Sequence, residues 1–415
     1  MAKATSGRSR RPPSARRQAS KQVGAKKPAA LPRKKKSRTP APDDQLDRAV
    51  NLAQIGKVKQ AFKAAEAILA AHPDHWRTLN FLSFLLARTD QNEAALVFAE
   101  RALAHAPDDA ETHRLLTLHC LACADKAGRP EAAISICRQF LDRYEPSPEI
   151  FAILSNMQIL VDRPSEALRT TDQGIALFPG NSTFHRNRST ALLELGRGEE
   201  AVEAFGRTLR PLPDDPGEAP AGVVSQYAAM AEGYDDNRLH QSYGRMMAQT
   251  IVKTVGATAG KRILDAGCGT GSLGTHIQAA HLVGIDLSPD MLAKAREKNL
   301  YQDLIEGDLV AVMAQRADRF DIVAATVVLY YMADLAPFFR QSARLLVPGG
   351  YLFFSTDSAP DSMEIGVSGE GEYAHSRAYV RRLAAATGFT EIAVRIMAHR
   401  GNPGFWWAFR REASS

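Results

Sequence analysis

Small residues recur at a fixed interval in the first half of the chain. Between residues 43 and 216, alanines lie 34 residues apart at each end of the region, and the middle interval of 72 leaves room for one further unit with a four-residue insertion. Such a period is typical of stacked helix pairs, so we expect about five of them. The alanines, each followed 12 residues later by a proline, are Ala61, Ala95, Ala167 and Ala201.

The second half alternates short apolar runs with amphipathic segments. This alternation predicts a parallel sheet covered by helices, and the final two runs, joined by a turn at 401–404, predict an antiparallel hairpin. We expect helices within 223–255, 335–346 and 378–387, another beginning at Pro289 with Ser288 as its cap, and a long loop at 357–377. The predicted strands lie within residues 262–265, 281–286, 305–308, 320–331, 345–356, 391–400 and 404–411.

A glycine-rich turn follows the first of these strands. In RILDAGCGTGSLG, Asp265 stands at the strand end, and Gly267, Gly269 and Gly271 alternate before a helix expected from Ser272. Glycines and a helix start of this kind hold a nucleotide-like ligand at a sheet edge, although a tight turn without a ligand has the same pattern. The dinucleotide fingerprint G-x-G-x-x-G would require glycine where Ser272 stands.

The form D-x-G-x-G-x-G, with further acids at the ends of the next two strands, resembles the class I S-adenosylmethionine-dependent methyltransferases over about residues 223–411. The resemblance implies a Rossmann-like sheet of seven strands with a terminal antiparallel hairpin, and S-adenosylmethionine as cofactor. It also implies that Asp265 lies near the methionine ammonium, and that Asp308 binds the adenine amino group with Leu309 against the ring. Asp286 comes 21 residues after Asp265, where an acid accepts hydrogen bonds from ribose hydroxyls. The full set of expected cofactor residues is Asp265, Gly267, Cys268, Gly269, Gly271, Asp286, Leu287, Asp308, Leu309, Tyr227, Tyr234 and Thr326.

Fewer residues are candidates to cover the cofactor or to take part in the methyl transfer itself. Tyr227 and Tyr234 either cover the cofactor as a lid or pack between helices. Methyl transfer needs a general base only if the acceptor carries a proton, and the candidates after the fourth strand are Thr326, Tyr330 and Tyr331. We take Tyr331 and His375 as the catalytic candidates, and His375 either acts as a base or caps the helix that follows it.

Acid assistance is not expected after the fourth strand, because Val327 stands where related methyltransferases often have an acid. Asn-Pro-Pro-Tyr and Asp-Pro-Pro-Tyr, which mark enzymes that methylate amides and amines, do not occur after Val323. This argues against nucleobase amines as the acceptor.

The 34-residue period resembles the tetratricopeptide repeat, whose solenoids bind proteins or peptides. The expected architecture is therefore an all-α solenoid at 43–216 and an α/β methyltransferase domain at 217–415. Two functions remain open. One is an active methyltransferase for a small molecule or a substrate presented by a protein bound to the repeats; the other is an interaction protein whose methyltransferase domain only binds cofactor or a partner.

Charge is divided unevenly along the chain. Of its 52 Lys and Arg residues, 14 lie within residues 1–42, which contain no acid, so the other 38 meet 46 acids. We expect 1–42 to be a disordered basic tail, either solvated or in nonspecific contact with nucleic acid or an anionic surface. Four cysteines predict no disulfide framework, and His119, Cys120 and Cys123 are too crowded for a zinc site, so no metal is expected. We also expect a cytoplasmic protein without a transmembrane segment.

Overall fold

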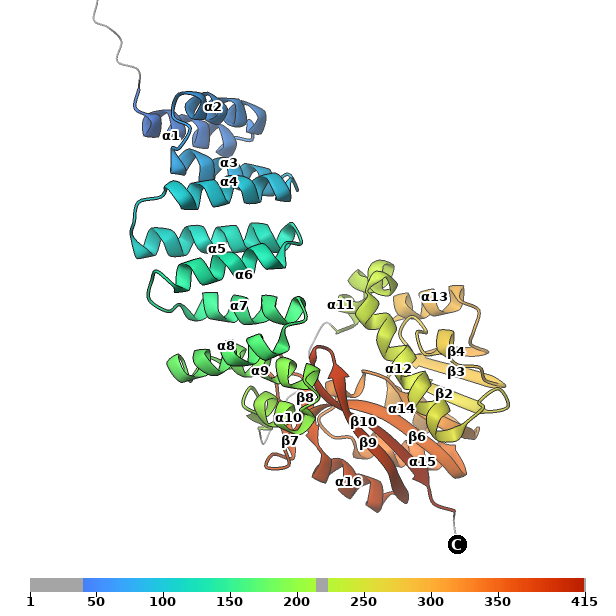
Figure 1. Ribbon diagram of the computed structural model, residues 1–415. Helices are drawn as coiled ribbons and strands as arrows, with labels where there is room; N and C mark the ends of the chain where they lie inside the picture. The colour runs from blue at the N-terminus through green and yellow to red at the C-terminus, as the bar shows by residue number, and fades with distance from the viewer. Residues whose placement is uncertain (1–39, 214–222, 414–415) are drawn as a thin grey trace, which may run out of the picture.

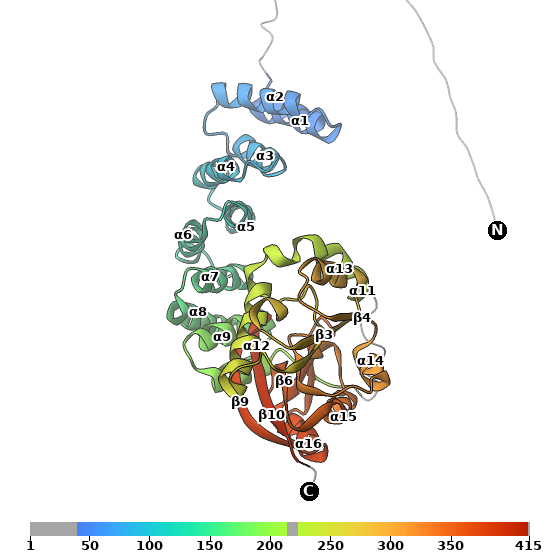
Figure 2. The same ribbon diagram turned by 90° about the vertical axis from the view of Figure 1, so that its right-hand side faces the viewer.

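The computed structural model describes residues 40–213 and 223–413, and its first part is a stack of helices. Ten helices stack as successive antiparallel pairs, and the last pair lies next to a sheet (Figure 1; Figure 2 shows several of these helices end-on). Most of the predicted basic tail lies outside the described residues. The helices are α1 (Pro42–Gln54), α2 (Val58–Ala71), α3 (Trp76–Ala87), α4 (Asn92–His105), α5 (Ala110–Lys126), α6 (Pro130–Leu141), α7 (Pro148–Leu160), α8 (Pro164–Leu177), α9 (Ser182–Glu194) and α10 (Gly198–Gly206).

The recurring alanines occupy the same place in every pair. Each is the fourth residue of the second helix, and its exposure does not exceed 1%, because a methyl group is all that fits where the two helices touch. The unit in the middle interval carries Ala133 at this place. The four-residue insertion lies before it, where α5 extends to 17 residues. The periodicity therefore predicted the helix pairs correctly.

The second part is built on one twisted sheet (Figure 1). Its central order is β9–β10–β6–β5–β2–β3–β4, with β10 antiparallel between β6 and β9. All seven predicted strands are present in this order, including the terminal hairpin. They are β2 (Arg262–Ala266), β3 (His281–Asp286), β4 (Asp303–Glu306), β5 (Phe320–Ala325), β6 (Leu346–Ala359), β9 (Phe389–His399) and β10 (Asn402–Arg411).

The sheet has ten strands, so the expected number of seven is wrong. The end of β6 runs beyond β5 and pairs with β8 (Tyr373–Ser376), which pairs with β7 (Ile365–Val367), which pairs with β1 (Arg210–Pro211). The predicted loop 357–377 therefore contains strands. The final hairpin also turns earlier than expected, at Arg400 and Gly401, which both have positive φ as a two-residue hairpin turn requires.

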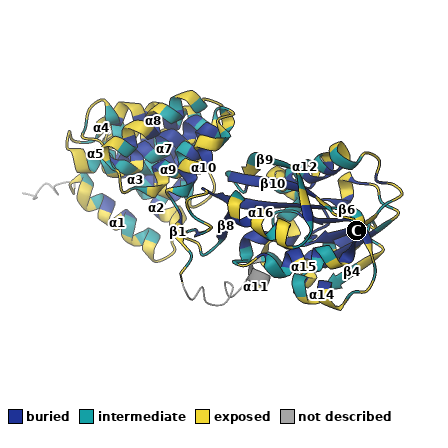
Figure 3. Cartoon of the chain, turned by 90° about the horizontal axis from the view of Figure 1, so that it is seen from below, coloured by how far each residue is buried: buried dark blue, intermediate teal, exposed yellow. Residues whose placement is uncertain are grey.

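Helices cover both faces of the sheet and bury its side chains (Figure 3). One face packs against α14 (Leu309–Gln315), α15 (Ala336–Leu345) and α16 (Arg377–Ala386), and the other against α12 (Arg238–Val255). Trp406 and Trp407 are neighbours in β10 and lie on opposite faces of the sheet, and both are core residues with at most 1% exposure. The remaining helices are α11 (Val223–Met230), η1 (Ala231–Asp236), η2 (Gly274–His276), α13 (Pro289–Glu297) and η3 (Leu329–Tyr331).

The last helix pair packs directly against the sheet. Val202 of α10 belongs to the same apolar cluster as the sheet's buried strands. Thr190 of α9 donates a hydrogen bond to the Gly401 carbonyl at 3.2 Å, and Arg377 forms a two-pronged ion pair with Glu199 at 2.7 and 2.8 Å. The boundary near residue 216 stays a prediction, and these contacts join the two parts across it.

No helix among the described residues is long and apolar enough to cross a membrane.

Candidate functional site

A cavity of about 460 Å³ opens at the carboxyl ends of β2, β3 and β5. Its roof is formed by α11, η1 and the start of α12. This is the place where doubly wound sheets bind ligands, and the volume suits a nucleoside-sized molecule. Among the expected cofactor residues Gly271 does not line it, and neither does the catalytic candidate His375. The expected residues that do line it are Asp265, Gly267, Cys268, Gly269, Asp286, Leu287, Asp308, Leu309, Tyr227, Tyr234, Thr326 and Tyr331.

The three glycines of the turn have different reasons to be glycine. All have positive φ, at 80°, 53° and 84° for Gly267, Gly269 and Gly271. A Cβ on Gly267 would lie 2.6 Å from Val328, and one on Gly271 would lie 2.9 Å from Tyr301, so both are packed against protein. Only the Cβ position of Gly269 faces open space, so Gly269 is the glycine at which the backbone lies open to a ligand.

The helix expected from Ser272 is absent. Turns and the short η2 occupy the eight residues between Ser272 and the start of β3. Helix α12 packs on this segment instead. A Cβ on Gly244 of α12 would lie 2.4 Å from the Ser272 hydroxyl, so this glycine in a helix interior permits the close approach.

Asp265 is buried at the base of the cavity with one oxygen unpaired. Its Oδ2 accepts a hydrogen bond from the Tyr301 hydroxyl at 2.6 Å, whereas Oδ1 has no partner among the described residues. Burial raises the pKa of Asp265 to about 7, although the Tyr301 hydrogen bond acts in the opposite direction. An unpaired buried carboxylate oxygen needs a donor, and the ammonium of a methionine moiety is such a donor.

Asp286 is held by the backbone on both of its oxygens. Gly269 donates to Oδ2 at 2.7 Å and Ser288 donates to Oδ1 at 2.9 Å. Burial raises its pKa, while these backbone hydrogen bonds lower it. Each carboxylate oxygen has more than one lone-pair site, so the fixed carboxylate can also accept two ribose hydroxyls. Ser288 caps α13 as predicted, by accepting a hydrogen bond from Met291.

The expected adenine end is more open. Asp308 caps α14 by accepting a hydrogen bond from Ala311 at 2.9 Å, and its side chain is exposed at the cavity mouth. Leu287 is 47% exposed beside it, and Leu309 is half-buried. Apolar side chains with incomplete burial fit a site that is completed by a bound ring.

Tyrosines from the roof and from the end of β5 meet over the cavity. The Tyr227 hydroxyl lies 2.7 Å from that of Tyr330, and the Tyr331 hydroxyl donates to Tyr227 at 3.2 Å. The rings of Tyr227 and Tyr234 are 6.2 Å apart. Burial raises the pKa of Tyr227 and raises that of Tyr234 to about 12, so both hydroxyls stay protonated at neutral pH.

Asp235 fastens the roof to the glycine turn, a role that the sequence did not indicate. Its carboxylate accepts from Thr270 at 2.6 Å and from Gln241 at 2.7 Å, and it pairs with Lys298 at 2.6 Å. Burial opposes ionisation, but the Lys298 and Thr270 hydrogen bonds together lower its pKa.

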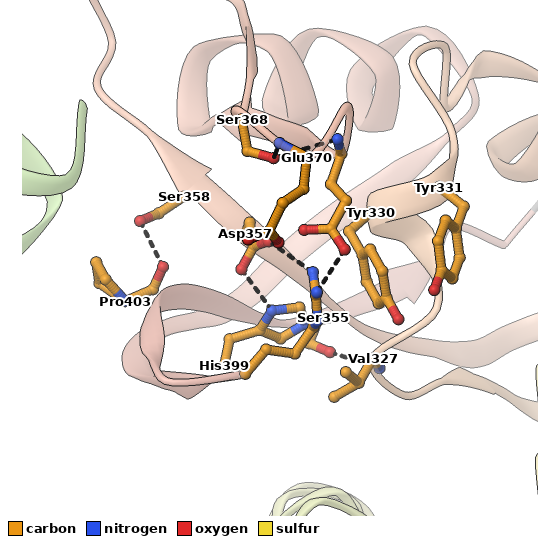
Figure 4. A network of polar contacts seen from close by, with 12 residues as sticks. Val327, Tyr330, Tyr331, Ser355, Asp357, Ser358, Ser368, Glu370, His399 and Pro403 are labelled. Carbon is orange, nitrogen blue, oxygen red and sulfur yellow. Dashed lines mark hydrogen bonds and ion pairs between the residues drawn. The ribbon is translucent and has the colours of Figure 1, made fainter. Parts of the chain in front are cut away.

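An ionic network lies next to the Tyr330 ring, on which its arginine packs (Figure 4). The Arg400 guanidinium lies 3.8 Å from the centre of the Tyr330 ring and pairs with Glu372 at 2.5 Å and Asp357 at 3.5 Å. Asp357 also accepts from Nδ1 of the buried His399 at 2.7 Å. These residues come from three separate strand ends, so their neighbourhood could not be read from the sequence.

His375 lies away from the cavity, in β8 rather than in a loop. It is fully buried, stacks on Tyr379, and its Nε2 lies 3.1 Å from the Ala333 carbonyl. Burial lowers its pKa to about 4. The cap of α16 is Ser376 and not His375. Nothing in this environment brings His375 to a ligand in the cavity.

Val327, at the cavity end of β5, has an unusual backbone conformation. Its φ is +51°, which is rare for a β-branched residue, and its N–H donates to the Ser355 hydroxyl at 3.0 Å (Figure 4).

We therefore expect Val327→Asn to raise the free energy of unfolding by about 1 kcal/mol, because asparagine tolerates left-handed backbone better than valine. Urea denaturation measures this change. Val328 is the matched control, because it is equally half-buried but has a φ of −133°. Val328→Asn should destabilise the protein, and a loss of stability in both variants would contradict the argument from strain.

Part of the chain is similar to known methyltransferases. Residues 264–354 match the sequence model of a family described as methyltransferase domain. The chain is 41% identical over 104 residues to a ubiquinone biosynthesis O-methyltransferase of Aromatoleum aromaticum, which covers 24% of this chain and 44% of that protein. It is 28% identical over 145 residues to a malonyl-[acyl-carrier protein] O-methyltransferase of Erwinia billingiae, which covers 34% and 56%.

Among solved structures, magnesium protoporphyrin IX methyltransferase of Synechocystis with bound S-adenosylmethionine aligns over 47% of this chain and 87% of that chain, at 19% identity and a TM-score of 0.34. The chain spans about half the length of the curated relatives it matches.

The residues present fit the cofactor of that family. The orphaned oxygen of Asp265, the backbone-held carboxylate of Asp286 and the open space at Gly269 supply an ammonium partner, a diol partner and a close backbone approach. The chain therefore contains a methyltransferase domain of the S-adenosylmethionine-dependent kind.

Proposed function

We propose that this protein transfers a methyl group from S-adenosylmethionine to a hydroxyl oxygen of a small acceptor. The observation that carries the proposal is the cavity in which Asp265 and Asp286 face the same space as the tyrosine roof. The matched relatives are named as O-methyltransferases, which supports oxygen as the acceptor atom. The cofactor supplies an electrophilic methyl group, so the chain has mainly to bind, orient and exclude water.

The charge of the cavity supports an acceptor whose reacting part, the part that enters the cavity, is uncharged. Three carboxylates line it, those of Asp265, Asp286 and Asp308, and none of its lining residues in the described ranges is Lys or Arg. A cavity of this sign attracts the cationic cofactor and repels an anionic acceptor. This favours a neutral phenol or alcohol over a free carboxylate such as a malonyl group.

The tyrosine roof would orient such an acceptor. Tyr331 and Tyr227 line the cavity, and their hydroxyls form a hydrogen-bonded row that ends at Tyr330. The Tyr331 hydroxyl can exchange its hydrogen bond to Tyr227 for one to an acceptor oxygen, and the rings exclude water from the reaction. Tyr331 thus acts in the proposal as an orienting group and not as a base.

For the helical part we propose a tetratricopeptide solenoid that holds a protein or peptide partner. A partner that carries the acceptor would present it to the cavity. The support is the buried alanine at one fixed place in five successive helix pairs. A contact of residues 1–42 with nucleic acid or an anionic surface is a further proposal, which rests on their 14 basic residues.

The alternative is an interaction protein without turnover. Purified protein analysed by mass spectrometry should carry S-adenosylmethionine or its demethylated product, and labelled methyl groups should pass to catechol or to a hydroxyl compound in cell extract. Cofactor binding without transfer to either acceptor would favour the alternative. Absence of bound cofactor after direct titration would overturn both readings of the site.

A further inference from the structure

One imidazole, that of His240, lies in the wall of the cavity. His240 is in the first turns of α12, three residues before Tyr243 and four before Gly244, and all three line the cavity. Residues three and four apart share one face of a helix, so the same face that packs on the glycine turn presents His240 to the ligand space. No other histidine in the described ranges lines this cavity.

The roof fixes the ring of His240 on one side. The ring stacks on Tyr234 with 4.1 Å between the centres and 24° between the planes. Its Nδ1 lies 3.2 Å from the carbonyl oxygen of Tyr234. A carbonyl oxygen can only accept a hydrogen bond, so we assign the proton to Nδ1, which leaves the lone pair on Nε2. A base whose second nitrogen is held by a backbone carbonyl is the arrangement found at oriented catalytic imidazoles.

The other ionisable groups of the cavity are poorly placed for this task. The carboxylate of Asp286 is engaged by two backbone N–H groups, and that of Asp265 is buried against Tyr301. Tyr227 and Tyr234 are kept protonated by burial. Asp308 caps α14 at the cavity mouth, whereas Nε2 of His240 keeps its lone pair. A hydroxyl acceptor must lose its proton during methyl transfer, and this imidazole can take it.

We propose that His240 is the general base of the methyl transfer, an inference that rests on the proposed hydroxyl acceptor. Nε2 of His240 takes the acceptor's proton while the acceptor oxygen forms its bond to the methyl carbon. The carbon–sulfur bond breaks and leaves its electron pair on sulfur, which becomes a neutral thioether. The imidazolium then returns its proton to solvent.

The decisive variant is His240→Asn. The asparagine amide can still donate to the Tyr234 carbonyl but cannot take a proton. With catechol as acceptor, the single-turnover rate should fall about a hundredfold or more, while affinity for S-adenosylhomocysteine stays within twofold of the wild type. The control is His276→Asn, because His276 is exposed on the neighbouring η2 and does not line the cavity.

Two further readouts separate a base from a structural residue. Nitrocatechol changes colour on ionisation, so bound to the wild-type protein it should be more ionised than the free probe at the same pH, and bound to His240→Asn it should not. Free imidazole should restore methyl transfer to His240→Ala. Equal rates and equal probe spectra for His240→Asn and the wild type would overturn the role of His240 alone. If the wild type itself neither binds nitrocatechol nor methylates catechol or an extract hydroxyl compound, the proposed function falls and this role falls with it.

Discussion

Replacing Asp286 with alanine is expected to weaken S-adenosylmethionine binding by about a hundredfold, which corresponds to about 2.7 kcal/mol. The carboxylate is the only side chain of the cavity held from two sides by backbone N–H groups, those of Gly269 and Ser288, at 2.7 and 2.9 Å. Its removal leaves the ribose hydroxyls without acceptors and removes the hydrogen bond that Gly269 donates to the end of β3. Calorimetric titration of the purified variant measures the change.

The matched control is Asp290→Ala. Asp290 lies four residues further on, in the first turn of α13, where it is exposed and outside the cavity lining. It should leave cofactor affinity within twofold of the wild type. Circular dichroism of both variants separates loss of binding from loss of folding. An Asp286→Ala protein that folds and binds with unchanged affinity would show that the ribose is held elsewhere.

Local pattern was enough to predict the elements that carry the cofactor. Buried parallel strands have continuous apolar runs, so β2, β3 and β5 could be read directly. Asp265 and Asp286, at the ends of β2 and β3, therefore had to meet at one sheet edge. The alanine period likewise reported a packing constraint, because each methyl group lies where two helices touch. In both cases the signal lies within one strand or one helix pair, so it can be recognised without knowing which distant segments are in contact.

The features that could not be predicted from the sequence depend on contacts between distant segments. The segment after Ser272 has no helix because α12 packs on it at Gly244, a contact across 28 residues. The strands β7 and β8 form only because the end of β6 extends past β5 and offers an unpaired edge. Arg400 reaches Tyr330 from the far end of the chain, and His240 becomes a cavity residue only through the docking of α12.

In the ligand-free protein, Asp265 should contribute a loss of stability as the pH rises from about 4 to about 7, and the difference between the wild type and Asp265→Asn isolates this contribution. Its pKa is raised to about 7 by burial, well above that of an aspartate in the unfolded chain. The folded state therefore binds the Asp265 proton more tightly than the unfolded state. The stability that Asp265 contributes is fully present below its pKa in the unfolded chain, and it is lost as the pH rises through its pKa in the folded protein. Asp286, whose pKa is also raised, adds its own slope, so the comparison must be with Asp265→Asn.

The same titration should govern cofactor binding with the opposite sign. An ammonium group prefers the ionised carboxylate, so affinity for S-adenosylhomocysteine should rise about tenfold per pH unit between about pH 5 and 7 and level off above that. Binding at about pH 6 should release nearly one proton, which calorimetry in two buffers of different ionisation enthalpy counts directly. In Asp265→Asn the neutral amide has no proton to release, so affinity should be low and flat, and the variant should be the more stable apo-protein at about pH 8. A wild-type affinity that does not change between these pH values would mean that the orphaned oxygen of Asp265 does not meet the ammonium, and the orientation of the cofactor in the cavity would have to be reversed.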